Sequence, residues 1–296
     1  EVLISPVIAA IPSDNPDREM SKLHSVYAWG TVGVVIISTL FLLFVGKQKW
    51  QWLPFLYIVI PLCAFLLFFG TKIPISNQSE QVEEKKTKKH ILFLCVLTIF
   101  FCGAAECTMA QWSSGYLEKA LGIPKIWGDL LGVAMFSVML GLGRSLYAKI
   151  GRNIGRVLVL GAAGASLCYL IVAISDITWL GLVACAITGF CVSMLWPGNL
   201  IVAADKFPQA GVFIYAIMAA GGDLGAAIGP QLVGVVTDSA IAIPAISDFA
   251  ATLGLAPEQL GMRLGILIGT LFPLCAIPVY AHFRRQDRKK NKETVA

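Results

Sequence analysis

Charged residues are scarce in this sequence. Only 14% of the 296 residues are Asp, Glu, Lys or Arg, whereas 57% are hydrophobic and the mean hydropathy is +0.75. Soluble domains carry about 25% charged residues, so this composition excludes an ordinary soluble protein and indicates an integral membrane protein. The net charge of +5 predicts no nucleic-acid partner, because the basic residues fall in connecting loops and in the C-terminal tail.

Signatures of catalysis, metal binding and disulfide formation are also missing. The sequence has only three histidines and contains neither a His-Glu-x-x-His nor a Gly-x-Ser-x-Gly motif, which argues against an intramembrane hydrolase or transferase. Its eight cysteines all fall in apolar segments and form no Cys-x-x-Cys pair, a pattern typical of small buried side chains. We therefore expect no enzyme, no cofactor and no metal ion.

Long apolar segments make up most of the chain. Each is close to the roughly 20 residues that a helix needs to cross a bilayer. They lack the polar alternation of barrel strands, and in lipid only helices or closed barrels satisfy the backbone groups. The sequence therefore predicts an all-α integral membrane protein with eight spans. The predicted spans are residues 27–46, 53–70, 91–112, 127–148, 156–175, 178–200, 211–236 and 262–283.

One long polar stretch, Thr71 to His90, divides these spans into two groups. Two spans and a short apolar segment, residues 2–11, precede it, and six spans follow. The short segment cannot cross a bilayer, so we interpret it as the end of a helix cut by N-terminal truncation. The resulting domains are 1–70, remnant of an N-terminal six-helix bundle; 71–90, a cytoplasmic central loop; 91–283, a complete C-terminal six-helix bundle; and 284–296, a basic cytoplasmic tail.

Lysine and arginine residues fall mainly on one side of the predicted membrane. They concentrate in the polar stretch, in the connection after residue 148 and in the C-terminal tail, and Arg144 is assigned to the same side. Cytoplasmic loops carry an excess of these residues. The central loop and the C-terminus are therefore predicted to be cytoplasmic in a multi-pass protein of the plasma membrane. This assignment leaves no basic residue deep within a span.

An internal repeat suggests how the helices are organised. Pro6 precedes Gly30 by the same number of residues as Pro197 precedes Gly221, and each interval contains a polar turn with another proline. The two segments lie at matching places before and after the polar stretch. This pattern favours a duplicated architecture of six helices, a loop and six helices, as in transporters built from parallel repeats. About eight helices of an inferred twelve are then present.

Three features of the sequence carry a family resemblance. They are Glu1 with Ser5-Pro6, Leu23-His24-Ser25 with Trp29-Gly30, and the segment from Gly143-Arg144 to Gly151-Arg152. With them the chain resembles the major facilitator superfamily and, within it, the fucose-permease-like branch of sugar and proton symporters. The third feature is a degenerate form of the family's Gly-x-x-x-Asp-Arg-x-Gly-Arg loop. The resemblance implies alternating access, with sugar as the leading solute class and the proton as coupling ion.

Two acidic residues, Glu106 and Asp223, lie inside predicted spans beside small residues. Ionisable groups within a membrane are costly and mark functional sites, and small neighbours indicate that both acids face a cavity. We predict that both carry protons, and the resemblance adds Glu1, because the related branch places an acid shortly before the corresponding proline. A second interpretation makes each carboxyl group a structural link between helices. Asp129 is attributed to the positive end of its helix.

A break in one span points to a solute site. Pro197 lacks a backbone N–H and so frees the carbonyl of Ser193. Such backbone is tolerated at membrane depth only where protein or water satisfies it, so the residues around it are expected at a central cavity. Indole rings can stack on a sugar, and amides can bond its hydroxyl groups, although packing is the alternative role. The predicted substrate-binding residues are Gln111, Trp112, Ser193, Trp196 and Asn199.

Together these features predict a secondary active transporter. Its expected reaction is proton-coupled symport of a small polar solute, and its expected partners are that substrate, protons and the lipid bilayer. The alternative is a polytopic membrane receptor or scaffold in which the buried acids only hold helices together.

Overall fold

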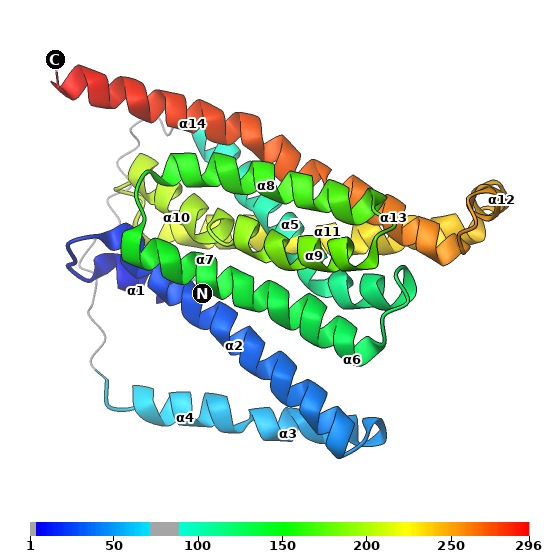
Figure 1. The fold of residues 1–296 in the computed structure, drawn as a ribbon. Coiled ribbons are helices and arrows are strands. Elements are labelled where there is room, and N and C mark those ends of the chain that lie inside the picture. Colours follow the sequence, from blue (N-terminus) through cyan, green and yellow to red (C-terminus); the bar gives the residue numbers. More distant parts are fainter. Residues whose placement is uncertain (1–3, 72–88, 296) are drawn as a thin grey trace.

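The chain folds as a bundle of long helices joined by short turns (Figure 1). The computed structural model describes residues 4–71 and 89–295, and within these ranges it contains helices and no strand. Glu1 lies outside the described residues. Before the gap the helices are α1 (Ile4–Ala10), α2 (Pro16–Phe44), η1 (Lys47–Trp52), α3 (Leu53–Tyr57) and α4 (Val59–Phe68). After it come α5 (Lys89–Lys119), α6 (Lys125–Trp127), η2 (Gly128–Ala134), α7 (Met135–Ile150), α8 (Ile154–Ile174), α9 (Thr178–Val192), α10 (Leu195–Lys206), α11 (Gly211–Ala242), α12 (Pro244–Thr252), α13 (Pro257–Gly269) and α14 (Leu271–Val295).

The predicted fold class is confirmed. Eight helical segments within the described ranges are long and apolar enough to cross a membrane, and each contains or overlaps one predicted span. The sequence pattern missed α12, a short helix that begins at Pro244 between two long spans. It also underestimated the length of α2, which begins at Pro16, where the side chain of Asn15 accepts a hydrogen bond from the Arg18 N–H and so caps the helix.

The segment from α9 to α10 is broken where the sequence predicts a break. The helix α9 ends at Val192 and α10 begins at Leu195, with Ser193 and Met194 forming a turn between them. Because Pro197 has no N–H, the carbonyl of Ser193 has no partner within its own helix. This leaves an acceptor in the interior of the bundle, one turn before Trp196.

The closest helix contact joins α5 and α11 through glycine. A Cβ atom at Gly225 would lie 1.9 Å from the Phe100 carbonyl oxygen, and one at Gly103 would lie 2.1 Å from the Gly222 carbonyl oxygen. Gly222, Gly225 and Gly229 recur at helical spacing on one buried face of α11. Small residues at this spacing let membrane helices approach closely. This glycine face packs α11 closely against α5.

We expect Gly225→Ala to destabilise the protein. Its new methyl group would meet the backbone oxygen of Phe100 at 1.9 Å, and backbone atoms cannot rotate away as a side chain can. Overpacking of this kind costs about 1–3 kcal/mol, so the melting temperature in detergent should fall. Gly30→Ala is the matched control, because no atom of the described residues lies within 4 Å of the position that its Cβ would take. Equal melting temperatures for the two variants would contradict the close packing.

The helix α2 packs along α7, whereas α3 and α4 lie apart from the main bundle (Figure 1). The indole N–H of Trp29 on α2 donates to Ser145 Oγ at 3.2 Å, and the same ring covers Gly141 on α7. By contrast, no residue of α3 or α4 is buried. The Tyr57 hydroxyl, in contact with Ser38 and the Val34 carbonyl, ties α3 to α2.

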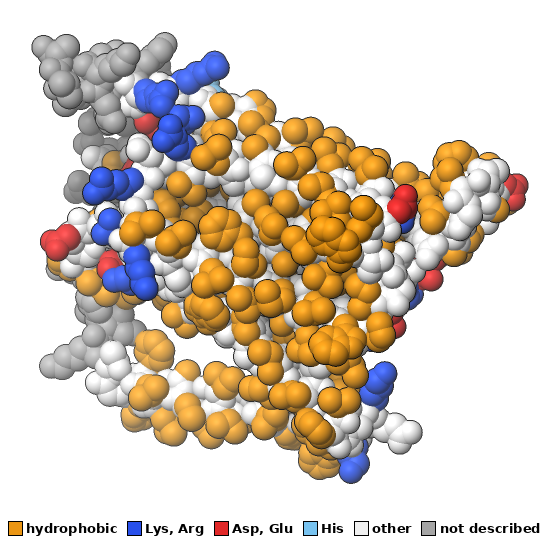
Figure 2. Space-filling view, viewed as in Figure 1, with side chains coloured by type: hydrophobic (Ala, Val, Ile, Leu, Met, Phe, Trp, Pro, Cys, Tyr) orange, Lys and Arg blue, Asp and Glu red, His pale blue; other side chains and the backbone are white. Residues whose placement is uncertain are grey.

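Basic side chains gather at one end of the bundle, where α8 begins and α14 continues beyond its apolar part (Figure 2). Apolar side chains cover most of the face shown between the two ends. The asymmetry agrees with the predicted distribution of lysine and arginine in the connections. Which side of the membrane this end faces stays a prediction.

Candidate functional site

Arg144 is the largest fully buried side chain that carries a charge. It lies on α7 with a relative exposure of 1%. Its helix presents buried residues at Leu140, Gly141, Tyr147 and Ala148, which is the spacing of one helical face. The arginine occupies the centre of that face and therefore points into the bundle.

Glu106 on α5 supplies the countercharge. Arg144 Nη2 lies 3.0 Å from Glu106 Oε1 and 3.0 Å from Oε2, and Glu106 is itself only 7% exposed. Hydrogen bonds between charged groups at this distance are among the stronger ones in proteins. The pair is shielded from water, so removing either charge leaves the other uncompensated in the interior.

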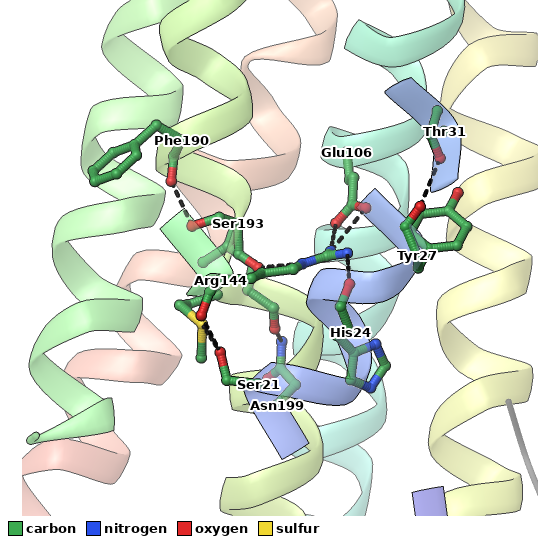
Figure 3. Close-up of polar contacts among 11 residues, drawn as sticks. Ser21, His24, Tyr27, Thr31, Glu106, Arg144, Phe190, Ser193 and Asn199 are labelled. Carbon is green, nitrogen blue, oxygen red and sulfur yellow. Dashed lines mark hydrogen bonds and ion pairs between the residues drawn. The ribbon is translucent and has the colours of Figure 1, made fainter. Parts of the chain in front are cut away.

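The other two nitrogens of the guanidinium donate to backbone carbonyls in two separate parts of the bundle, the turn between α9 and α10 and the helix α2 (Figure 3). Nε donates to the Ser193 carbonyl at 2.8 Å, and Nη1 donates to the His24 carbonyl at 3.1 Å. The first of these acceptors is the one that Pro197 removes from the helical ladder. Arg144 therefore connects α7 to α5, to the break between α9 and α10, and to α2.

The helix α2 also contacts the backbone of Arg144 and places an aromatic ring near its guanidinium. Ser21 Oγ donates to the Arg144 carbonyl at 2.7 Å and lies 3.4 Å from Met194 Sδ. The ring of Tyr27 lies 5.8 Å from Arg144 Cζ, within the range of a cation–π contact. Residues before the polar stretch thus complete a site whose charges come from residues after it.

This arrangement corrects the prediction that no basic residue lies deep in a span. The similarity of residues 143–152 to a loop motif predicts that Arg144 lies in the connection after its helix, whereas the predicted span 127–148 contains it. The structure places Gly143 and Arg144 inside α7, and only Gly151 to Asn153 form the connection. Glycine is required at residue 143, where a Cβ would meet Ser193 Oγ at 2.2 Å.

The other predicted acids lie away from this pair. Asp223 is exposed on α11, next to the exposed Leu224, and no hydrogen bond or ion pair to it is found within the described ranges. The neighbouring glycine face takes up the packing of α11, and the expectation that Asp223 faces a cavity rather than lipid stays a prediction. Asp129 accepts hydrogen bonds from Ser114 and Lys125, which fits a structural role.

The two predicted tryptophans occupy different surroundings. The indole N–H of Trp112 donates to the Pro230 carbonyl at 3.0 Å, so it joins α5 to α11. Trp196 is 8% exposed, its ring lies against Gly222, and its indole nitrogen is buried with no hydrogen-bond partner among the described residues. A free buried donor is costly, which distinguishes Trp196 as the better candidate for a polar ligand.

The three remaining predicted substrate-binding residues also differ in their surroundings. Gln111 is exposed, whereas Asn199 is 2% exposed and donates to the Leu195 carbonyl and to the Tyr280 hydroxyl, each at 2.8 Å. The amide of Asn199 thus faces α14, which corrects the expectation that it shares one cavity with Ser193. Ser193 Oγ donates to the Phe190 carbonyl at 2.7 Å, so its backbone rather than its hydroxyl contacts the ion pair.

A bundle of membrane-length helices with an ion pair in its interior is typical of secondary transporters. A family model described as Major Facilitator Superfamily matches residues 3–230. The chain belongs to this superfamily, and it is a membrane transport protein that acts on a small-molecule substrate. The family thus points to transport rather than to catalysis, and it does not favour the receptor or scaffold alternative.

A solved structure shows the same fold. It is described as a Major Facilitator Superfamily transporter, FucP, in the outward conformation, and it aligns with a TM-score of 0.69 and 17% sequence identity. The alignment covers 96% of this chain and 72% of that chain. No curated protein matches the sequence significantly.

Proposed function

We propose that this transporter is a proton-coupled symporter of a small polar solute, with a sugar as the leading candidate. In this mechanism Glu106 carries the proton and Arg144 is its countercharge. The observation that supports the proposal is the buried ion pair, with both carboxylate oxygens 3.0 Å from Arg144 Nη2. Sugar as solute rests on the sequence resemblance to the fucose-permease-like branch and on the fold shared with FucP.

A proton taken up by Glu106 changes the energetics of the whole site. In the ionised state the carboxylate neutralises Arg144, which is only 1% exposed. Protonation removes that neutralisation and leaves a buried guanidinium held only by neutral carbonyl groups. Uncompensated buried charge is unfavourable by several kcal/mol, so proton binding favours a conformation in which Arg144 reaches water or another anion. This links the proton to a change of conformation.

The solute is proposed to bind beside the broken helix. Trp196 offers an aromatic ring and a buried N–H that has no partner among the described residues, and Gln111 offers an exposed amide. Asp223 and Glu1 remain candidate proton carriers of second rank. We further propose that residues 1–70 and 91–283 belong to two bundles that rock about this site, that the basic end of the molecule faces the cytoplasm, and that the membrane is the plasma membrane.

The proposal is tested with the transporter reconstituted in liposomes. An inside-alkaline pH gradient should drive accumulation of one or more labelled sugars above their external concentration. Because symport draws its energy from the proton gradient, a protonophore should abolish accumulation but leave equilibration intact. Protein-free liposomes are the control. Accumulation that follows a sodium gradient, or equilibration that no gradient accelerates, would contradict proton symport.

A further inference from the structure

Three positions on one face of α2 converge on Arg144. Ser21, His24 and Tyr27 recur every three residues, and in Figure 3 they lie along α2 beside the guanidinium. Ser21 binds the Arg144 backbone, the carbonyl of His24 binds its Nη1, and the Tyr27 ring lies 5.8 Å from its Cζ. Beyond Tyr27 the contact of α2 with α7 passes from Arg144 to Ser145, which accepts from Trp29.

The bonds differ in how they depend on charge. The bond from Ser21 goes to a backbone carbonyl and does not require the guanidinium. The bond to the His24 carbonyl comes from the guanidinium itself, whose position is set by Glu106 on its other side. A change in the charge of Glu106 therefore affects α2 through the side chain of Arg144.

We infer that Ser21 and the carbonyl of His24 are positioning groups that hold Arg144 against Glu106, and that protonation of Glu106 releases α2 from α7. The inference rests on the proposed proton-carrying role of Glu106. When the carboxylate takes up a proton, Arg144 leaves for a more polar site and the bond to His24 is lost. By linkage, a conformation that withdraws α2 removes an acceptor from Arg144 and weakens its hold on Glu106.

The titratable groups at this junction can be separated by substitution. They include Glu106 on α5, the His24 imidazole and the Tyr27 hydroxyl on α2, and Arg144 and Tyr147 on α7. Asp17 and Arg18 on α2 and Asp205 on α10 lie close enough to Tyr147 to interact with it electrostatically. The turn between α9 and α10 contributes Ser193 and Met194, which do not titrate. His24→Gln removes the imidazole and keeps the backbone carbonyl that accepts from Arg144. Glu106→Gln removes the proposed proton site and keeps its shape.

The test is hydrogen exchange of residues 17–30 and 140–150 in the reconstituted transporter, corrected for intrinsic rate and referred to peptides of α8. In the unmodified protein, protection of both segments should fall as the pH is lowered. In Glu106→Gln, protection of both segments from hydrogen exchange should be low at every pH. His24→Gln should keep the pH dependence. Retained pH dependence in Glu106→Gln, or its loss in His24→Gln, would overturn the inference.

Ser21→Ala tests the positioning role directly. Loss of one buried hydrogen bond should increase opening of these segments about five-fold while leaving the pH dependence in place. Ser25→Ala is the matched control, because the bond that the described residues give to Ser25 Oγ is local, a donation to the Lys22 carbonyl of its own helix at 2.7 Å. Ser21→Cys, which keeps the size and weakens the donor, should be intermediate. Equal protection from hydrogen exchange in Ser21→Ala and Ser25→Ala would contradict the positioning role of Ser21.

Failure of this inference is distinguishable from failure of the proposed function. If Glu106→Gln abolishes proton-driven accumulation of solute but leaves hydrogen exchange in α2 unchanged, Glu106 carries the proton and α2 does not respond to its protonation. If accumulation survives in Glu106→Gln, the proton is carried elsewhere, whatever α2 does.

Discussion

Glu106→Gln should abolish proton-driven accumulation of solute and preserve exchange of solute across the membrane. Glutamine keeps the size of the neutral acid and its ability to form hydrogen bonds, but it cannot release a proton. The variant therefore imitates the protonated state, in which Arg144 has lost the partner at 3.0 Å. Counterflow requires only that the loaded carrier change its access, whereas accumulation requires the proton to leave. Both quantities can be measured in the same proteoliposomes.

Other acidic residues provide controls for this result. Asp129→Asn alters an acid that bonds Ser114 and Lys125 and should leave accumulation unchanged. Asp223→Asn tests the second candidate, which is exposed on α11. If Glu106 were only a structural link, an amide would serve as well as an acid, and accumulation by Glu106→Gln would be near normal. If Asp223→Asn alone loses proton-driven accumulation, Asp223 on α11 rather than Glu106 is the proton site.

The features predicted from the sequence are those that depend on local chemistry. Eight apolar runs predict the eight membrane-length helices that the described part of the chain contains, because a bilayer imposes its thickness on every span. Pro197 predicted the freed carbonyl of Ser193, since a missing N–H is a covalent property of proline. Glu106 was singled out for its charge within a span. None of these inferences needed knowledge of which helices touch.

The features missed are those that depend on tertiary contact. Arg144 and Glu106 are separated by 38 residues, and nothing local indicates that their helices place them together. The loop motif predicts a position for Arg144 in a connection, whereas the apolar run around it predicts a position inside a helix. Asn199 and Trp112 carry polar groups that suit a solute, yet in the fold those groups bond Tyr280 and the Pro230 carbonyl. The sequence shows that these two side chains can form hydrogen bonds. It does not show which group in the fold is the partner of each.

Arg144→Met should destabilise the protein more than any substitution of an exposed arginine. Methionine fills much of the same volume, but Glu106 then becomes a buried acid without a countercharge, and the carbonyls of Ser193 and His24 lose their donors. Breaking a buried pair by removing one partner costs about 3–5 kcal/mol. The melting temperature should fall clearly, and proton-driven accumulation should be lost. Arg152→Met, in the exposed connection after the same helix, should change neither.

The double variant Glu106→Gln with Arg144→Met separates charge balance from proton coupling. Removing both charges eliminates the uncompensated acid, so part of the lost stability should return, since buried pairs can be replaced by neutral side chains at little cost. Accumulation should remain absent, because no proton site is restored. Arg144→Lys keeps one charge but lacks the fork that reaches Glu106, Ser193 and His24 together, so it should recover stability incompletely. A double variant no more stable than Arg144→Met would show that Arg144 acts through its carbonyl contacts rather than by neutralising Glu106. Restored accumulation in the double variant would exclude both residues from the proton path.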